Sequence, residues 1–268
     1  LDSSVKPGEV VLITNAGEMI RDFYTESTPK HCMFEWVYFA RVESELEGES
    51  VYNVRYRLGQ QLAKLVQAQN LKPDVVMPIP ETSRVAANAA SEVLGVPYRE
   101  GLIKNRYSSR TFILESEAAR KNAIRQKLFP IPQEITGKKV LVIDDSIVRG
   151  NTAKQIIQLL RQAGAKEIYF ASTCPPIKYP CYYGIDFPTT KELPAHEQSV
   201  EEMQTYLGVD ALIYQTLDGL EESLNHLPLC NACLTGNYPI DVSASGERFS
   251  EERHADRKKQ NEKILVRT

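Results

Sequence analysis

The chain has 268 residues, of which 42% are hydrophobic, enough for one sizeable α/β domain with appendages or for two small domains. The formal net charge of -3 gives no overall basic field, so bulk charge does not support binding to nucleic acid or to a membrane surface. The sequence shows neither a secretory leader nor an apolar run of about 20 residues. We therefore expect a cytoplasmic protein that acts on small molecules.

Strands and helices are predicted to alternate along most of the chain. Strands are predicted over 10–13, 74–80, 138–144, 168–173 and 211–214. Helices are predicted over 50–70, 83–94, 152–163 and 217–224, and Gly95 and Gly164 are well placed to end two of them. This alternation predicts an α/β fold with a doubly wound, mostly parallel sheet, whose ligands bind beyond the carboxyl ends of the strands.

The segment VLVIDDSIVRGNT, residues 140–152, runs from an apolar strand into two aspartates and a polar turn. The turn from Ser146 to Thr152 leads into a helix N-terminus, where backbone amides and the helix dipole attract an anion such as phosphate. Asp144 and Asp145 would repel that anion, and they suit sugar hydroxyls or a hard divalent ion instead. The combination favours a phosphorylated ribose with magnesium over the simpler reading, in which two solvated aspartates cap the next helix.

This segment resembles the PRPP-binding signature of type I phosphoribosyltransferases, and more narrowly that of the glutamine phosphoribosylpyrophosphate amidotransferase family. Further motifs occur in that family's order: FEWVYFAR (34–41), PIPETS (78–83), GLIKNRYSSRTFI (101–113) and YGIDFPT (183–189). The resemblance extends from about residue 5 to residue 242. It implies the type I phosphoribosyltransferase fold.

The resemblance implies a site for PRPP and magnesium. It assigns the ribose hydroxyls and the magnesium environment to Asp144 and Asp145, with Ser83 as a further magnesium neighbour. The 5-phosphate is assigned to Ser146, Ile147, Val148, Arg149, Gly150, Asn151 and Thr152, where Asn151 stands in place of the family's usual threonine. The pyrophosphate loop is assigned to Glu81, Thr82 and Ser83. A closing lid brings the catalytic candidates Lys104, Arg106, Tyr107 and Arg110.

The resemblance further implies a homo-oligomeric enzyme that transfers ammonia to C1 of PRPP with release of pyrophosphate, the first step of purine biosynthesis. Residues 1–30 resemble the end of that enzyme's glutaminase domain, 31–242 its phosphoribosyltransferase domain, and 243–268 form a charged tail. Without an N-terminal cysteine, the chain is expected to use free ammonia or a separate glutaminase domain or subunit. The alternative is a regulatory PRPP-binding module without transferase activity; Lys104 and Arg106, which serve the leaving group, favour the enzyme.

Five cysteines at irregular spacing argue against a disulfide framework in a cytosolic chain. Cys230 and Cys233 form a CxxC pair, which is weak evidence by itself. In one branch of the family, cysteines matching Cys32, Cys181, Cys230 and Cys233 hold a 4Fe-4S cluster. We favour that cluster over buried thiols or a zinc site. Cys174 has no counterpart in the set and is expected to pack as a small apolar residue.

Overall fold

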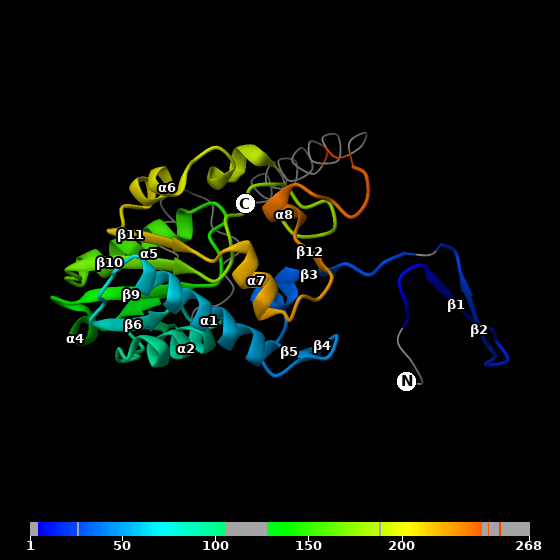
Figure 1. Cartoon of the computed structure of the whole chain (residues 1–268), viewed down its shortest axis with the longest axis horizontal. Coiled ribbons are helices and arrows are strands. Elements are labelled where there is room, and N and C mark those ends of the chain that lie inside the picture. The colour runs from blue at the N-terminus through cyan, green and yellow to red at the C-terminus, as the bar shows by residue number, and fades with distance from the viewer. Residues whose placement is uncertain are drawn as a thin grey trace, which may run out of the picture.

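The computed structural model describes residues 5–25, 27–105, 128–187 and 189–242, together with 246 and 252. Its centre is a four-stranded parallel sheet with the strand order β11-β10-β9-β6 (Figure 1). The strands are β6 (Val75–Pro78), β9 (Lys139–Asp144), β10 (Glu167–Ser172) and β11 (Ala211–Tyr214). The predicted α/β class is confirmed.

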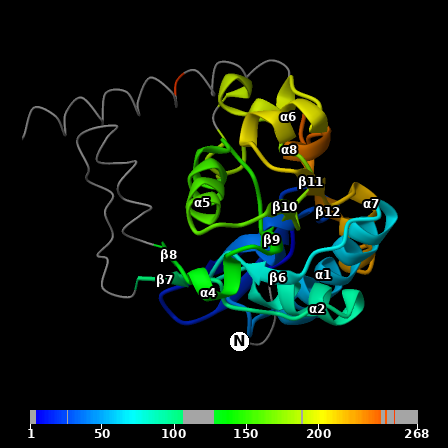
Figure 2. The same ribbon diagram turned by 90° about the vertical axis from the view of Figure 1, so that its left-hand side faces the viewer.

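Helices cover both faces of this sheet. They are α1 (Val51–Ala68), α2 (Arg84–Leu94), α5 (Asn151–Gln162) and α6 (Val200–Leu207). Helices α1 and α2 lie on one face, and α5 and α6 on the other (Figure 2). Because successive strand residues point to opposite faces, Leu141 packs with α1 and α2, whereas Val142 packs with α5. Burial on both faces explains why the strands read as continuous apolar runs.

Shorter elements surround the sheet. They are β1 (Glu9–Ile13), β2 (Met19–Phe23), β3 (His31–Cys32), the π-helix η1 (Glu35–Phe39), β4 (Glu45–Leu46), β5 (Glu49–Ser50), β7 (Leu102–Lys104), β8 (Leu128–Pro130), α4 (Pro132–Ile135), the 3-10 helices η2 (Thr190–Glu192) and η3 (Pro194–His196), α7 (Leu217–Ser223), β12 (Leu229–Cys230) and α8 (Ala232–Thr235). Every predicted strand and helix is present with small shifts at its ends. The largest shifts are two residues, at the predicted strand 74–80, which ends at Pro78, and at the predicted helix 50–70, which ends at Ala68. Helix α6 and all of these shorter elements except β1 and α7 were not predicted.

Strands β1 and β2 form an antiparallel hairpin that stands apart from the sheet (Figure 1). Its apolar side chains are largely exposed, including Val10 (54%), Leu12 (56%), Ile13 (65%) and Phe23 (52%). A two-stranded hairpin is only marginally stable in water by itself.

Within the described ranges, we find no helix that combines the length and the apolar character of a membrane span.

Helices α1 and α2 cross closely at Gly59. A Cβ atom at this position would lie 2.1 Å from the carbonyl oxygen of Ala86, so a side chain here forces the helices apart. Although alanine is favoured over glycine by about 1 kcal/mol inside a helix, we predict that Gly59→Ala lowers the free energy of unfolding by about 1–3 kcal/mol. Urea denaturation would measure this. Lys64→Ala, on the exposed side of α1, is the control; an unfolding free energy for Gly59→Ala at or above wild type would contradict the close crossing.

Candidate functional site

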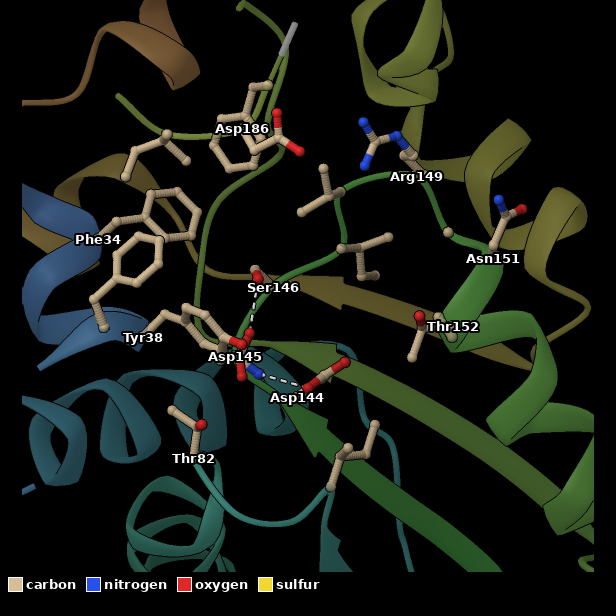
Figure 3. A pocket seen from close by; sticks show the side chains of 18 of the residues that line it. Phe34, Tyr38, Thr82, Asp144, Asp145, Ser146, Arg149, Asn151, Thr152 and Asp186 are labelled. Atoms are coloured by element: carbon tan, nitrogen blue, oxygen red, sulfur yellow. Dashed lines mark hydrogen bonds between the residues drawn. The ribbon is translucent and has the colours of Figure 1, made fainter. Parts of the chain in front are cut away.

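A cavity of about 740 Å³ opens at the carboxyl ends of β6 and β9 (Figure 3). The segments that follow these two neighbouring strands supply residues 79–82 and 144–153 of its lining. Phe34, Tyr38, Phe39, Lys104, Ile185, Asp186 and Phe187 complete the lining. The cavity therefore lies where the sequence analysis expected a ligand, beyond the carboxyl edge of a parallel sheet.

The turn between β9 and α5 forms one side of this cavity. Gly150 has the left-handed φ of 75° and precedes the first helical residue, Asn151. Among the described residues no side chain caps the helix, and the Lys154 amide donates to the Gly150 carbonyl at 2.9 Å. The amides of the first turn therefore lack helical acceptors and, with the helix dipole, suit an anion.

Glycine is required at position 150 for two reasons. Its φ disfavours L side chains, and a Cβ atom would lie 2.9 Å from the ring of Tyr206. The tight turn that presents the helix N-terminus to the cavity therefore depends on this residue.

A second helix N-terminus lies beside the first, where β6 leads into α2. Thr82 lines the cavity, and the Glu81 carboxylate, which also lines it, pairs with Arg84 at 2.7 Å. Ser83 does not line the cavity; it is 1% exposed, and its hydroxyl has no hydrogen-bond partner among the described residues. The peptide bond between Pro80 and Glu81 is cis.

Asp144 and Asp145 lie between these two helix ends and are both largely buried. The Asp145 amide donates to Asp144 Oδ1 at 2.9 Å, and the Ser146 hydroxyl donates to Asp145 Oδ1 at 2.7 Å (Figure 3). Burial raises the pKa of Asp144 well above its ordinary range, and the charge of Asp145 raises it further. Burial raises the pKa of Asp145 to about 6, partly offset by the Ser146 hydroxyl and the positive charge of Arg55. Two such carboxyl groups favour a ligand that brings a cation or hydrogen-bond donors.

Aromatic side chains form the wall on the other side of the aspartates. Phe34 and Tyr38 lie across Asp145 from Asn151 and Thr152 (Figure 3). The rings of Phe34 and Phe187 meet edge to face with centroids 5.2 Å apart. Burial and the charges of the two aspartates raise the pKa of Tyr38. These residues belong to the motifs FEWVYFAR and YGIDFPT, but no role in the site was predicted for them.

The structure brings most of the predicted site residues together. Glu81, Thr82, Lys104, Asp144, Asp145, Ser146, Ile147, Val148, Arg149, Gly150, Asn151 and Thr152 all line the one cavity. The Arg149 guanidinium pairs with Glu192 at 2.7 Å. The lid candidates Arg106, Tyr107 and Arg110 lie outside the described residues.

A second cavity, of about 750 Å³, is lined by Cys32, Cys181, Cys230 and Cys233. Cys230 lies opposite Cys32 in the pairing of β12 with β3. Burial raises the pKa of the Cys32 thiol to about 11, and it also raises the pKa values of Cys230 and Cys233. In the part of the chain that is described, no three His, Cys, Asp or Glu side chains form a metal-ligand group. Cys174 is fully buried in the core, as predicted.

The fold is similar to that of type I phosphoribosyltransferases, and the turn 146–152, named the phosphate turn after its expected ligand, stands at the same edge of the sheet as the cavity. A family profile described as "Phosphoribosyl transferase domain" matches residues 52–184. The amidophosphoribosyltransferase of Methanocaldococcus jannaschii is 45% identical to this chain over 255 residues, and that of Pseudomonas aeruginosa is 48% identical to it over 225 residues. These matches cover 89% and 81% of this chain, and 53% and 44% of the relatives. The chain thus spans about half the length of the curated relatives it matches.

A solved structure gives the same result. The glutamine phosphoribosylpyrophosphate amidotransferase of B. subtilis, complexed with ADP and GMP, has a TM-score of 0.79 at 38% identity, covering 90% of this chain and 54% of that chain. The predicted resemblance is confirmed: the chain is similar to the phosphoribosyltransferase half of the amidophosphoribosyltransferases.

The raised pKa of Asp145 makes stability depend on pH. Its folded value of about 6 exceeds the unfolded value of about 3.9, so stability is fully present below the unfolded value and is lost as pH rises through about 6. In metal-free and ligand-free protein, we predict that Asp145→Asn raises the free energy of unfolding by about 1–3 kcal/mol near pH 7.5, and that this gain shrinks towards about pH 4.5. Urea denaturation in EDTA at both pH values would measure it.

Asp218→Asn, at an exposed carboxyl group on α7, provides the control, which should show little difference from wild type at either pH. A gain for Asp145→Asn that stays constant between the two pH values would contradict the buried, raised carboxyl group.

Proposed function

We propose that this chain transfers ammonia to C1 of PRPP, releases pyrophosphate and forms 5-phosphoribosylamine, the first step of purine biosynthesis. The observation that carries the proposal is the meeting of an uncapped helix N-terminus with two buried carboxyl groups in one cavity. The names of the relatives at 45% and 48% identity point to the same reaction.

Different parts of the cavity bind the 5-phosphate, the ribose and the pyrophosphate of PRPP. The amides at the start of α5 hold the 5-phosphate, because a helix N-terminus favours negative charge. Asp144 and Asp145 accept hydrogen bonds from the ribose hydroxyls, which relieves the cost of their burial. The start of α2, with Thr82 on the cavity surface, lies on the pyrophosphate side.

Magnesium belongs to the proposal because the donor set fits a hard cation. Two buried carboxyl groups with raised pKa values gain most from a nearby positive charge, and carboxylate oxygens are preferred magnesium ligands. Asp144 and Asp145 would hold the ion. Ser83 belongs to the proposal through its motif alone: its hydroxyl has no hydrogen-bond partner among the described residues, but it does not line the cavity. The ion would neutralise charge on the leaving pyrophosphate.

The chain's own groups position the reactants. The bond between C1 and the pyrophosphate oxygen breaks with its electron pair on the leaving group, and the nitrogen lone pair of ammonia forms the new bond to C1. The nitrogen then loses a proton to solvent. The Lys104 ammonium, exposed on the cavity wall, offsets the charge of the leaving pyrophosphate. Arg106, Tyr107 and Arg110 remain proposed partners in that task. The aromatic wall keeps water from C1.

A glutaminase domain or subunit is the proposed partner and the source of ammonia when glutamine is the nitrogen donor. The division into residues 1–30, 31–242 and 243–268 belongs to this proposal. The exposed apolar side chains of the β1–β2 hairpin support it, since such a hairpin is stabilised by packing against further structure.

The four cysteines Cys32, Cys181, Cys230 and Cys233 are proposed to hold a 4Fe-4S cluster. All four line one cavity, and thiolate ligands suit iron–sulfur clusters. The raised pKa values of Cys32, Cys230 and Cys233 mean that the thiols are protonated without a metal, so the cysteines must release protons when a cluster binds. The cluster would tie β3 to β12 and α8.

The transferase proposal is tested by pyrophosphate release from PRPP and magnesium with ammonium chloride, with glutamine, or with neither. We predict turnover with ammonium chloride, and a loss of at least about 100-fold for Asp144→Ala, because the ribose loses a buried acceptor. Asp218→Asn, remote from the cavity, should keep wild-type turnover. Saturable PRPP binding without turnover in the wild type would instead support a regulatory module.

The cluster proposal is tested by anaerobic reconstitution with iron and sulfide. We predict that the wild type gains visible thiolate-to-iron absorbance and about four irons per chain, and that Cys233→Ser loses most of both because one ligand is removed. Cys174→Ala removes a buried thiol outside the set and should keep the cluster. A colourless, iron-free wild type after reconstitution would refute the proposal.

A further inference from the structure

Arg55 is a charged residue inside the apolar face of α1. It is 6% exposed and lies on the same helix face as Val51, Leu58 and Leu62, which are fully buried. Its guanidinium donates three hydrogen bonds to backbone carbonyls: Nε to Trp36 at 2.8 Å, and Nη2 to Tyr38 at 3.1 Å and to Ala40 at 2.9 Å. All three acceptors belong to a single short segment, residues 34–40.

These acceptors are available because the segment contains one π-helical turn. The turn is closed by the Ala40 amide, which donates to the Glu35 carbonyl at 2.8 Å. The last carbonyls of a helix lack hydrogen-bond donors within the helix, and the helix dipole favours a cation beside them. A guanidinium offers five N–H donors in a fixed plane, so one side chain can bind several carbonyls at once.

The segment that Arg55 holds carries the aromatic wall of the cavity. Phe34, Tyr38 and Phe39 all line the site, and Tyr38 lies close enough to Asp144 and Asp145 to respond to their charges. Arg55 also exerts a favourable Coulomb interaction on Asp145. The phosphate turn, by contrast, lies between β9 and α5, and none of the three hydrogen bonds of Arg55 reaches it.

We propose that Arg55 is a positioning residue for the transfer reaction: through the carbonyls of Trp36, Tyr38 and Ala40 it holds the aromatic wall against the ribose, opposite the phosphate turn. This inference rests on the proposed function. Because the three hydrogen bonds of Arg55 reach the wall and none reaches the turn 146–152, its loss lowers kcat more than it raises the KM for PRPP, to which only the lost attraction for Asp145 contributes. Small misplacements of groups around a reacting centre are enough to cost about 100-fold in rate.

Trp36 provides a readout that is independent of turnover. It is the chain's single tryptophan, it is 1% exposed, and its carbonyl accepts the shortest of the three Arg55 hydrogen bonds. Release of the segment would expose its indole to a soluble quencher.

The test compares the full chain as wild type, Arg55→Met, Arg55→Lys and Arg161→Met. Arg161 is the control because its guanidinium also donates to carbonyls, those of Lys166 and Gly208, and it lies at the opposite end of α5 from the phosphate turn. It further pairs with Asp210 at 2.6 Å. For each variant, acrylamide quenching of Trp36 and kcat and KM for PRPP with ammonium chloride are measured on protein that unfolds cooperatively.

For Arg55→Met we expect kcat to fall by at least about tenfold, KM to stay within about threefold, and quenching of Trp36 to rise at least about twofold. Arg55→Lys keeps the charge and part of the hydrogen bonding, so it should lie between Arg55→Met and wild type in both readouts, and it serves as the deciding variant if Arg55→Met does not fold. Arg161→Met should match wild type.

Wild-type kcat and quenching in folded Arg55→Lys and Arg55→Met would overturn the positioning role, and so would a change in KM alone. Failure of the proposed function has a different signature, the absence of turnover in the wild type itself.

Discussion

The site depends on the burial of two adjacent carboxyl groups at the end of β9. Desolvation makes the ionised forms of Asp144 and Asp145 costly, and their mutual repulsion adds to that cost. The fold places compensating dipoles and charges around them: the Asp145 amide, the Ser146 hydroxyl and the Arg55 guanidinium. These groups offset only part of the cost of ionising the two carboxyl groups. A ligand that brings hydroxyl groups or a cation therefore stabilises the ionised pair further.

The same strand end must also accept an anion, and the structure separates the two tasks in space. The carboxyl groups lie at the end of β9, while the amides that suit phosphate lie beyond the turn that closes at Gly150. A residue with a side chain at position 150 would place its Cβ atom against the ring of Tyr206, and the turn could not present the helix N-terminus to the cavity. A ligand with a phosphate at one end and a diol in its middle satisfies both groups at once.

Local signals in the sequence were sufficient to predict the sheet, three of the four helices that cover it, and the turn between β9 and α5. The fourth helix, α6, was not predicted, although Ser199 and Glu202 form a capping box at its start. The aromatic wall was harder to predict, because it depends on a π-helical turn and on Arg55, which come together only in the folded chain. A lone arginine within the apolar stripe of α1 was the one visible sign of that contact. For Ser83 the sequence predicted a site residue that does not line the cavity: its motif is present, but its side chain is buried away from the cavity surface.

Segment 31–40 links the two cavities physically. Cys32 lines the cysteine cavity, Tyr38 lines the site, and Phe34 lines both. One end of the segment is paired to β12 through β3, and the other end is held by Arg55 on α1. A cluster bound at the first end would restrain the same backbone that Arg55 restrains at the second. The position of the aromatic wall is thus set by contacts on both sides of it.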